Sequence, residues 1–274
     1  MTNFTSRMDR VQSPIIPIVG QLIKDNPGTI SLGQGVVYYP PPPEVIEGIS
    51  QFLSQPNNNQ YKSVQGINLL IEQIVRKSPK DNQTNINSTR SIMVTAGANM
   101  AFMNAILAIT NAGDEIILKT PYYFNHEIAI TMANCHPILV NTDNNYKLSL
   151  DNINAVITPK TRAIVTISPN NPTGVVYSES SLREVNQLCR EKGLYHISDE
   201  AYEYFTYDGI KHFSPASIID SDDYTISLYS LSKAYGVASW RMGYRVIPNH
   251  LLPAVNKLQD TILIYPPVIA QYAA

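Results

Sequence analysis

A clear strand–helix–strand unit of this chain lies at residues 163–199, which read AIVTISPNNPTGVVYSESSLREVNQLCREKGLYHISD. Ala163–Ile167 and Tyr195–Ser198 are short apolar runs, as expected of buried strands. Between them, Ser178–Lys192 begins with a serine that can cap a helix and ends before Gly193, a residue type favoured just after a helix. Apolar strands joined through a helix are typical of a parallel sheet with helices packed on it.

The same alternation of strands and helices extends through most of the chain. Further strands are predicted at Ser91–Thr95, Glu115–Leu118, His136–Val140, Thr225–Tyr229 and Gly243–Ile247. Further helices are predicted at Glu44–Ser54, Ile67–Lys77 and Ala98–Ile109, and a last one begins near Asn249. The helix at Ala98–Ile109 is apolar nearly all round and should be buried. We therefore predict an α/β fold, a mostly parallel seven-stranded sheet with helices on both faces, in which residues 1–43 form an N-terminal arm or small-domain segment and residues 44–274 the large domain.

The composition argues against several functional classes. The 274 residues carry 20 Lys and Arg against 22 Asp and Glu, a balance that argues against nucleic-acid binding. Cys135 and Cys189 are too few for a disulfide scaffold, and neither they nor the five scattered histidines have the spacing of metal ligands, so no metal is expected. Met1–Gln12 has no apolar core, and no stretch approaches the ~18 apolar residues of a membrane span, so we expect a soluble cytoplasmic protein.

The residues that follow the predicted strands matter because a parallel α/β sheet binds ligands at the carboxyl ends of its strands. Ala96-Gly97-Ala98-Asn99 is a small-residue turn leading into a helix, and a helix N-terminus attracts phosphate. Tyr123, after the next strand, can stack on a planar ring. Asn171 lies in a rigid turn, where Pro172 keeps it out of helical conformations and can aim its amide into a cleft. Taken singly, packing and ordinary turn formation also explain each of these features.

Charged residues follow two later strands. Asp199 ends an apolar strand, where a carboxylate is costly unless a partner such as a cationic ring nitrogen faces it; capping of the next helix is the simpler explanation. Lys233, in Ser230-Leu231-Ser232-Lys233, can act as nucleophile and base if its pKa is depressed, and Arg241 can hold a phosphate with two hydrogen bonds. Taken alone, Lys233 is better explained as a solvated surface lysine. The combination fits one ligand, a phosphorylated aromatic heterocycle that forms a Schiff base: pyridoxal 5′-phosphate.

From about Ile30 to the last residue, the sequence resembles the class I and II aminotransferases of fold type I, the group of aspartate and kynurenine aminotransferases. The motifs that carry the resemblance are Leu32-Gly33-Gln34-Gly35, Gln60-Tyr61 with Gln65-Gly66, Val94-Thr95-Ala96-Gly97-Ala98, Asn171-Pro172-Thr173-Gly174, Ser198-Asp199-Glu200-Ala201-Tyr202, and Ser230-Leu231-Ser232-Lys233 with Trp240-Arg241-Met242-Gly243-Tyr244. The resemblance implies a pyridoxal-phosphate-dependent homodimer that moves the amino group of an L-amino acid to a 2-oxo acid through a Schiff base on Lys233.

The resemblance also implies a role for each matching residue. Lys233, Asp199 and Tyr202 would be catalytic: Asp199 would keep the pyridine nitrogen protonated, and the freed amine of Lys233 would move the proton from the substrate Cα. Gly35 and Asn171 would hold the substrate carboxylate. The cofactor would be bound by Gly97, Ala98, Tyr123, Asn171, Asp199, Tyr202, Ser230, Lys233 and Arg241, with Tyr61 supplied by the partner subunit.

Two departures from the family pattern leave other functions open. Family members continue well beyond Ala274, so the small C-terminal domain and the arginine that clamps the substrate carboxylate are expected to be largely absent; Arg7, Arg10 and Arg245 lie outside the matching motif. Val36–Tyr39 replaces an aromatic-Pro-Asp run. A pyridoxal-phosphate-dependent C–S lyase, or a truncated cofactor-binding chain without catalysis, are therefore alternatives.

The non-catalytic alternative makes a structural prediction of its own. The apolar face formed by Leu251, Leu252, Val255 and Leu258 would lack cover.

His126, close to Tyr123, would face either the cleft or solvent.

Overall fold

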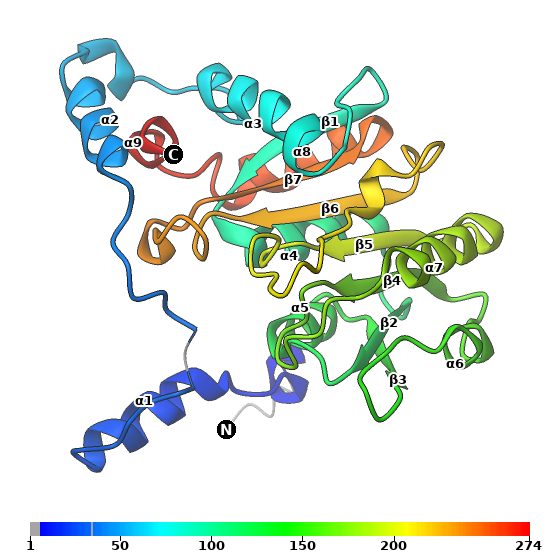
Figure 1. Cartoon of the computed structure of the whole chain (residues 1–274). Coiled ribbons are helices and arrows are strands. Elements are labelled where there is room, and N and C mark those ends of the chain that lie inside the picture. The colour runs from blue at the N-terminus through cyan, green and yellow to red at the C-terminus, as the bar shows by residue number, and fades with distance from the viewer. Residues whose placement is uncertain (1–5, 34) are drawn as a thin grey trace, which may run out of the picture.

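The computed structural model describes residues 6–33 and 35–274, so residues 1–5 and Gln34 of the Leu32–Gly35 motif lie outside the described part (Figure 1). All seven predicted strands form one sheet with the order β1-β7-β6-β5-β4-β2-β3. The strands are β1 (Arg90–Thr95), β2 (Glu115–Thr120), β3 (His136–Asn141), β4 (Thr161–Ile167), β5 (Tyr195–Asp199), β6 (Thr225–Ser230) and β7 (Gly243–Pro248). Only β7 pairs antiparallel, with β1 and with β6, so the prediction of a mostly parallel sheet is confirmed.

Helices cover both faces of the sheet because its strands are apolar on both sides (Figure 1). One face carries α4 (Gly97–Ile109), α5 (Phe124–Met132) and α8 (Leu252–Ile262). The other face carries α3 (Asn68–Asp81), α6 (Leu150–Ala155) and α7 (Glu179–Lys192). The alternation is visible within β2, where Ile116 and Leu118 belong to the first core and Ile117 to the second.

The predicted helices form where their end signals place them. The side chain of Ser178 accepts a hydrogen bond from the backbone N–H of Ser181 at 3.2 Å, and Gly193 ends α7 with a left-handed φ of 66°. The apolar helix predicted at Ala98–Ile109 is α4, and Phe102 and Ile106 are buried against the sheet. Helix α2 (Pro43–Leu53) has Pro43 in its first turn, as expected.

The N-terminal region contains a helix that the sequence analysis did not predict. Residues 15–25 form α1, which has no buried residue and lies away from the sheet (Figure 1). Residues 35–42 form neither helix nor strand and lead into α2, which packs against α9 (Val268–Ala273), where Gly48 allows close approach to the backbone of Ala273. The division into an arm and a large domain near residue 43 stays a prediction. None of the described helices is both long and apolar enough to cross a membrane.

The expectation that the apolar face of α8 lacks cover is wrong. Leu251 and Val255 are buried, and Leu252 packs on the same core. The physical reason is that α4 is apolar all round, so its side away from the sheet needs a partner, and α8 supplies it. Helices α5, α6 and α9 were also missed; α6 and α9 span six residues each, too short for a clear helical period.

Candidate active site

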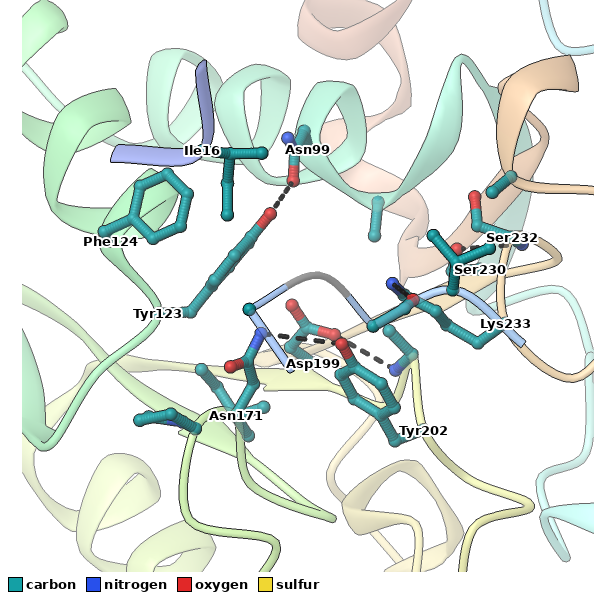
Figure 2. A pocket seen from close by; sticks show the side chains of 18 of the residues that line it. Ile16, Asn99, Tyr123, Phe124, Asn171, Asp199, Tyr202, Ser230, Ser232 and Lys233 are labelled. Carbon is teal, nitrogen blue, oxygen red and sulfur yellow. Dashed lines mark hydrogen bonds between the residues drawn. The ribbon is translucent and has the colours of Figure 1, made fainter. Parts of the chain in front are cut away.

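The turns that follow β1, β2, β4, β5 and β6 converge on one pocket of about 610 Å³ at the carboxyl ends of the strands (Figure 2). The predicted site residues that line it are Gly35, Ala98, Tyr123, Asn171, Asp199, Tyr202, Ser230, Lys233 and Arg241. Gly97 lies against the Arg241 side chain next to the pocket. Tyr61 lies outside this pocket and is 83% exposed. The structure therefore brings together every predicted residue except Tyr61, which was assigned to a partner subunit.

Asp199 ends β5 with its side chain only 6% exposed. Its Oδ2 lies 3.0 Å from Nε2 of His126, and its Oδ1 accepts a hydrogen bond from the backbone N–H of Ala201 at 3.0 Å. His126 is itself buried and stacks on Phe102 with ring centroids 3.9 Å apart. It therefore lies behind Asp199, facing neither the cleft nor solvent. These two partners offset the cost of keeping a carboxylate out of water.

The N-terminus of α4 opens on the pocket, and no side chain among the described residues 6–33 and 35–274 caps its backbone N–H groups. The guanidinium of Arg241 lies beside it, where Nη1 donates to the carbonyl of Ala238 at 2.9 Å and to Oγ of Ser232 at 3.3 Å. Gly97 has a φ of +77°, and a Cβ at this position would overlap the guanidinium. Free N–H groups and an adjacent cation form a site for a phosphate-sized anion.

Lys233 follows β6 in a turn and extends its half-buried side chain into the pocket (Figure 2). Its Nζ donates a hydrogen bond to the carbonyl of Gly35 at 2.8 Å. Burial, and secondly the positive charge of Arg241, hold the pKa of Lys233 below the usual value for a lysine. A lowered pKa increases the share of neutral amine near neutral pH, and the neutral amine is the form that acts as nucleophile or base.

Tyr202 and Asn171 stand next to Asp199, and Tyr123 stands across the pocket from them (Figure 2). The Asn171 amide is 3.5 Å from the Tyr202 hydroxyl. Burial first, and then the charge of Asp199, raise the pKa of Tyr202 to about 12, so its hydroxyl stays protonated and able to donate near neutral pH. The Tyr123 hydroxyl accepts a hydrogen bond from Asn125 at 2.7 Å, which fixes its ring at the wall of the pocket.

Sequence reasoning missed several pocket residues. Ser232 and Phe124 line the pocket and adjoin Lys233 and Tyr123 in the sequence, so their position next to assigned residues was the available signal. Ile16 of α1 also lines the pocket; the apolar residues of this segment recur at helical spacing, but that pattern does not show what the helix face packs on. Val36 lines the pocket as well, in the segment where the chain departs from the family pattern.

Comparison with known proteins identifies the family. The model for class I and II aminotransferases matches residues 27–274. The chain belongs to this family. Similar proteins include an aromatic aminotransferase of Arabidopsis thaliana, 30% identical over 269 residues that cover 95% of this chain and 66% of that protein. An aspartate aminotransferase of Pyrococcus abyssi is 31% identical over 272 residues, or 98% of this chain and 70% of that protein.

Solved structures of aminotransferases share the fold. The aspartate aminotransferase of Thermus thermophilus with maleate superposes with a TM-score of 0.92 at 28% identity, covering 100% of this chain and 72% of that one. The aromatic aminotransferase of Pyrococcus horikoshii superposes with a TM-score of 0.85 at 31% identity, covering 93% and 69%. The chain thus spans about two thirds of the length of the relatives it matches.

The pairing of His126 with Asp199 is testable by His126→Phe, which keeps a ring against Phe102 and removes the donor to the carboxylate. We expect the free energy of unfolding to fall by about 2–4 kcal/mol in urea titrations at neutral pH, because Asp199 loses a buried partner. The control is His136→Phe at the exposed start of β3, for which a change within about 0.5 kcal/mol is expected. Equal losses in the two variants would contradict the pairing.

Proposed function

We propose that this chain acts as a pyridoxal-phosphate-dependent aminotransferase, which moves the amino group of an L-amino acid to a 2-oxo acid. The observation that carries the proposal is that Lys233 and the buried carboxylate of Asp199 line one pocket, which ends at the open N-terminus of α4. Relatives named as aromatic and aspartate aminotransferases support the reaction class.

The residues present fit the proposed cofactor group by group. The backbone N–H groups at the N-terminus of α4 can bind its phosphate. Arg241 lies beside them, and Ser230 at the end of β6 can add a further hydrogen bond. Asp199 suits a protonated ring nitrogen, and Tyr202 with Asn171 can donate hydrogen bonds to the phenolic oxygen. Tyr123 offers a ring face for stacking. Lys233 would hold the aldehyde carbon through Nζ.

When bound, pyridoxal phosphate supplies an aldehyde that joins to amines and a cationic ring that accepts electrons from the substrate Cα. The chain supplies the charges and the proton carrier. Asp199, held by His126 and Ala201, keeps its carboxylate aimed at the pocket, so a ring nitrogen facing it stays protonated. Lys233, with its lowered pKa, would take a proton from the substrate Cα as a base and then, as an acid, deliver it to the aldehyde-derived carbon of the cofactor.

The substrate side of the pocket is built partly by the N-terminal segment. Gly35 and Val36 line the same pocket as Asn171, and we propose that Gly35 and Asn171 hold the substrate carboxylate. The relatives' names include both aromatic and aspartate aminotransferases, so the donor panel that tests the function includes both kinds of amino acid.

We further propose a homodimer in which Tyr61 reaches the phosphate site of the partner subunit. Two observations support this: Tyr61 is 83% exposed, and it lies outside the pocket of its own chain although it belongs to a family motif. If Tyr61 contacts a phosphate but does not line the pocket of its own chain, the phosphate it contacts is that of a second copy of the chain.

The function is tested first by Lys233→Ala. The purified chain mixed with pyridoxal phosphate is expected to show the visible absorbance of lysine-bound cofactor, and Lys233→Ala is expected to abolish it and all transfer from aromatic amino acids or aspartate to a 2-oxo acid. Lys147→Ala, at an exposed lysine, is the matched control and should change neither. Absorbance that survives in Lys233→Ala would refute the assignment.

Adding a cysteine conjugate to the same panel separates the alternative functions. Repeated release of pyruvate, with ammonia or a thiol, from that conjugate without any amino acceptor would favour the C–S lyase. Bound cofactor without a half-reaction on any donor would favour the non-catalytic chain.

The shared site is tested by mixing two inactive variants. Lys233→Ala and Tyr61→Phe chains, each defective alone, should regain activity when mixed, because one site of the mixed dimer then has an intact Lys233 and an intact Tyr61 from its partner. We expect up to about a quarter of the wild-type activity at equal mixing, since random pairing makes half of the dimers mixed and each of these has one intact site. No gain on mixing, with exchange of subunits verified by mass spectrometry, would contradict the proposal.

A further inference from the structure

The segment that leads from the pocket to α2 crosses directly over the turn that carries Lys233. Gly35 accepts the hydrogen bond from Lys233 Nζ at 2.8 Å. Four residues later, the hydroxyl of Tyr39 donates to the carbonyl of Ala234 at 3.0 Å and lies 3.4 Å from the carbonyl of Lys233. One short segment therefore touches both ends of the same residue, the amine of Lys233 and its backbone.

The segment of residues 35–40 and the Lys233–Gly236 turn also lie close together at Gly236. Gly236 has a φ of +68°, and a Cβ there would lie 3.3 Å from the carbonyl oxygen of Tyr39 and 3.4 Å from Pro40. The segment is stiff on its far side, because Pro40–Pro43 follow Tyr39 and lead straight into α2. Because this side of the segment is stiff and the Tyr39 hydroxyl contacts the turn, a shift of α2 would also shift the turn.

The Tyr39 hydroxyl supplies a hydrogen-bond donor to a backbone carbonyl of the turn. The turn around Lys233 has no helix or strand hydrogen bonds of its own to order it. Within the described part of the chain, the Ala234 carbonyl receives no hydrogen bond other than that of Tyr39, whereas the Lys233 carbonyl also accepts from Gly236. Loss of the hydroxyl leaves one carbonyl without a protein donor and frees the segment from the turn.

We propose that the Tyr39 hydroxyl is a positioning group for Lys233: it ties residues 35–40 to the Lys233–Gly236 turn and so holds the amine in the pocket. The proposal rests on the proposed role of Lys233 but concerns only its placement. The segment is where Val36–Tyr39 departs from the family pattern, so the tie is argued from the contacts of this chain alone.

The test compares Tyr39→Phe, which removes only the hydroxyl, with Tyr38→Phe. Tyr38 is the neighbouring tyrosine, 99% exposed, and serves as the matched control. In the cofactor-free chain, the extent of acetylation of Lys233 by acetic anhydride is measured against pH by peptide mass spectrometry. We expect its midpoint to move to higher pH in Tyr39→Phe, because the released amine gains water and moves away from Arg241, whose charge lowers its pKa.

A second measurement uses pyridoxal phosphate itself. Its dissociation constant, from absorbance titration, is expected to rise about three- to tenfold in Tyr39→Phe, the usual effect of one lost hydrogen bond, and to stay unchanged in Tyr38→Phe. Gly236→Ala, which crowds the backbone of Tyr39 and Pro40 and strains the positive φ of the turn, should act in the same direction as Tyr39→Phe. Thermal unfolding of each variant confirms that it is folded.

The possible results distinguish the positioning role of Tyr39 from the proposed function of the chain. If Tyr39→Phe matches Tyr38→Phe in the acetylation profile, the positioning role is wrong, whatever the cofactor does. If the wild-type chain does not bind pyridoxal phosphate, the proposed function is wrong, and the acetylation profile alone decides the role of Tyr39.

Discussion

The pocket is built around one buried carboxylate, that of Asp199, whose side chain is only 6% exposed. A carboxylate buried at the end of an apolar strand is costly without partners, and the structure gives Asp199 two, the imidazole of His126 and the backbone N–H of Ala201. His126 in turn is fixed by stacking on Phe102 of α4. The helix that presents its N-terminus to the pocket thus also supports the acid at its centre, so the anion site and the acid are built as one unit.

The sheet topology explains why the remaining groups surround Asp199. Strand β5 lies between β4 and β6, and all three run parallel, so the turns that follow them emerge at the same edge. The turn after β4 brings Asn171, and the turn after β6 brings Lys233. Strand β7 returns antiparallel beside β6 and places Arg241, which precedes it, at the N-terminus of α4.

Much of this arrangement could be predicted from the sequence because it depends on local patterns. Apolar runs marked all seven strands, and the residue after each strand marked Asp199, Lys233 and Asn171 as candidates. Family motifs then ordered these weak signals into one site. Asp199 ends β5 and Lys233 lies in the turn that follows β6, so the pairing of these two parallel strands brings both residues to the same edge of the sheet.

What the sequence could not predict depends on contacts between distant segments. The burial of His126 requires Phe102, the cover of α4 requires α8, and the contact of Tyr39 with Ala234 joins residues far apart in the chain. Helix α1 has an apolar side but no buried residue, so its pattern shows a helix face without showing what it packs on. In each case the local pattern fits several environments, and only the fold selects one.

We propose that Lys233, and no other lysine, is the amine that holds the cofactor. This assignment is tested by reducing the chain with borohydride in the presence of pyridoxal phosphate and locating the label by peptide mass spectrometry. We expect the reduced cofactor on Lys233, with little on exposed lysines such as Lys147 and Lys192. Label spread over those surface lysines, with Lys233 unmodified, would contradict it.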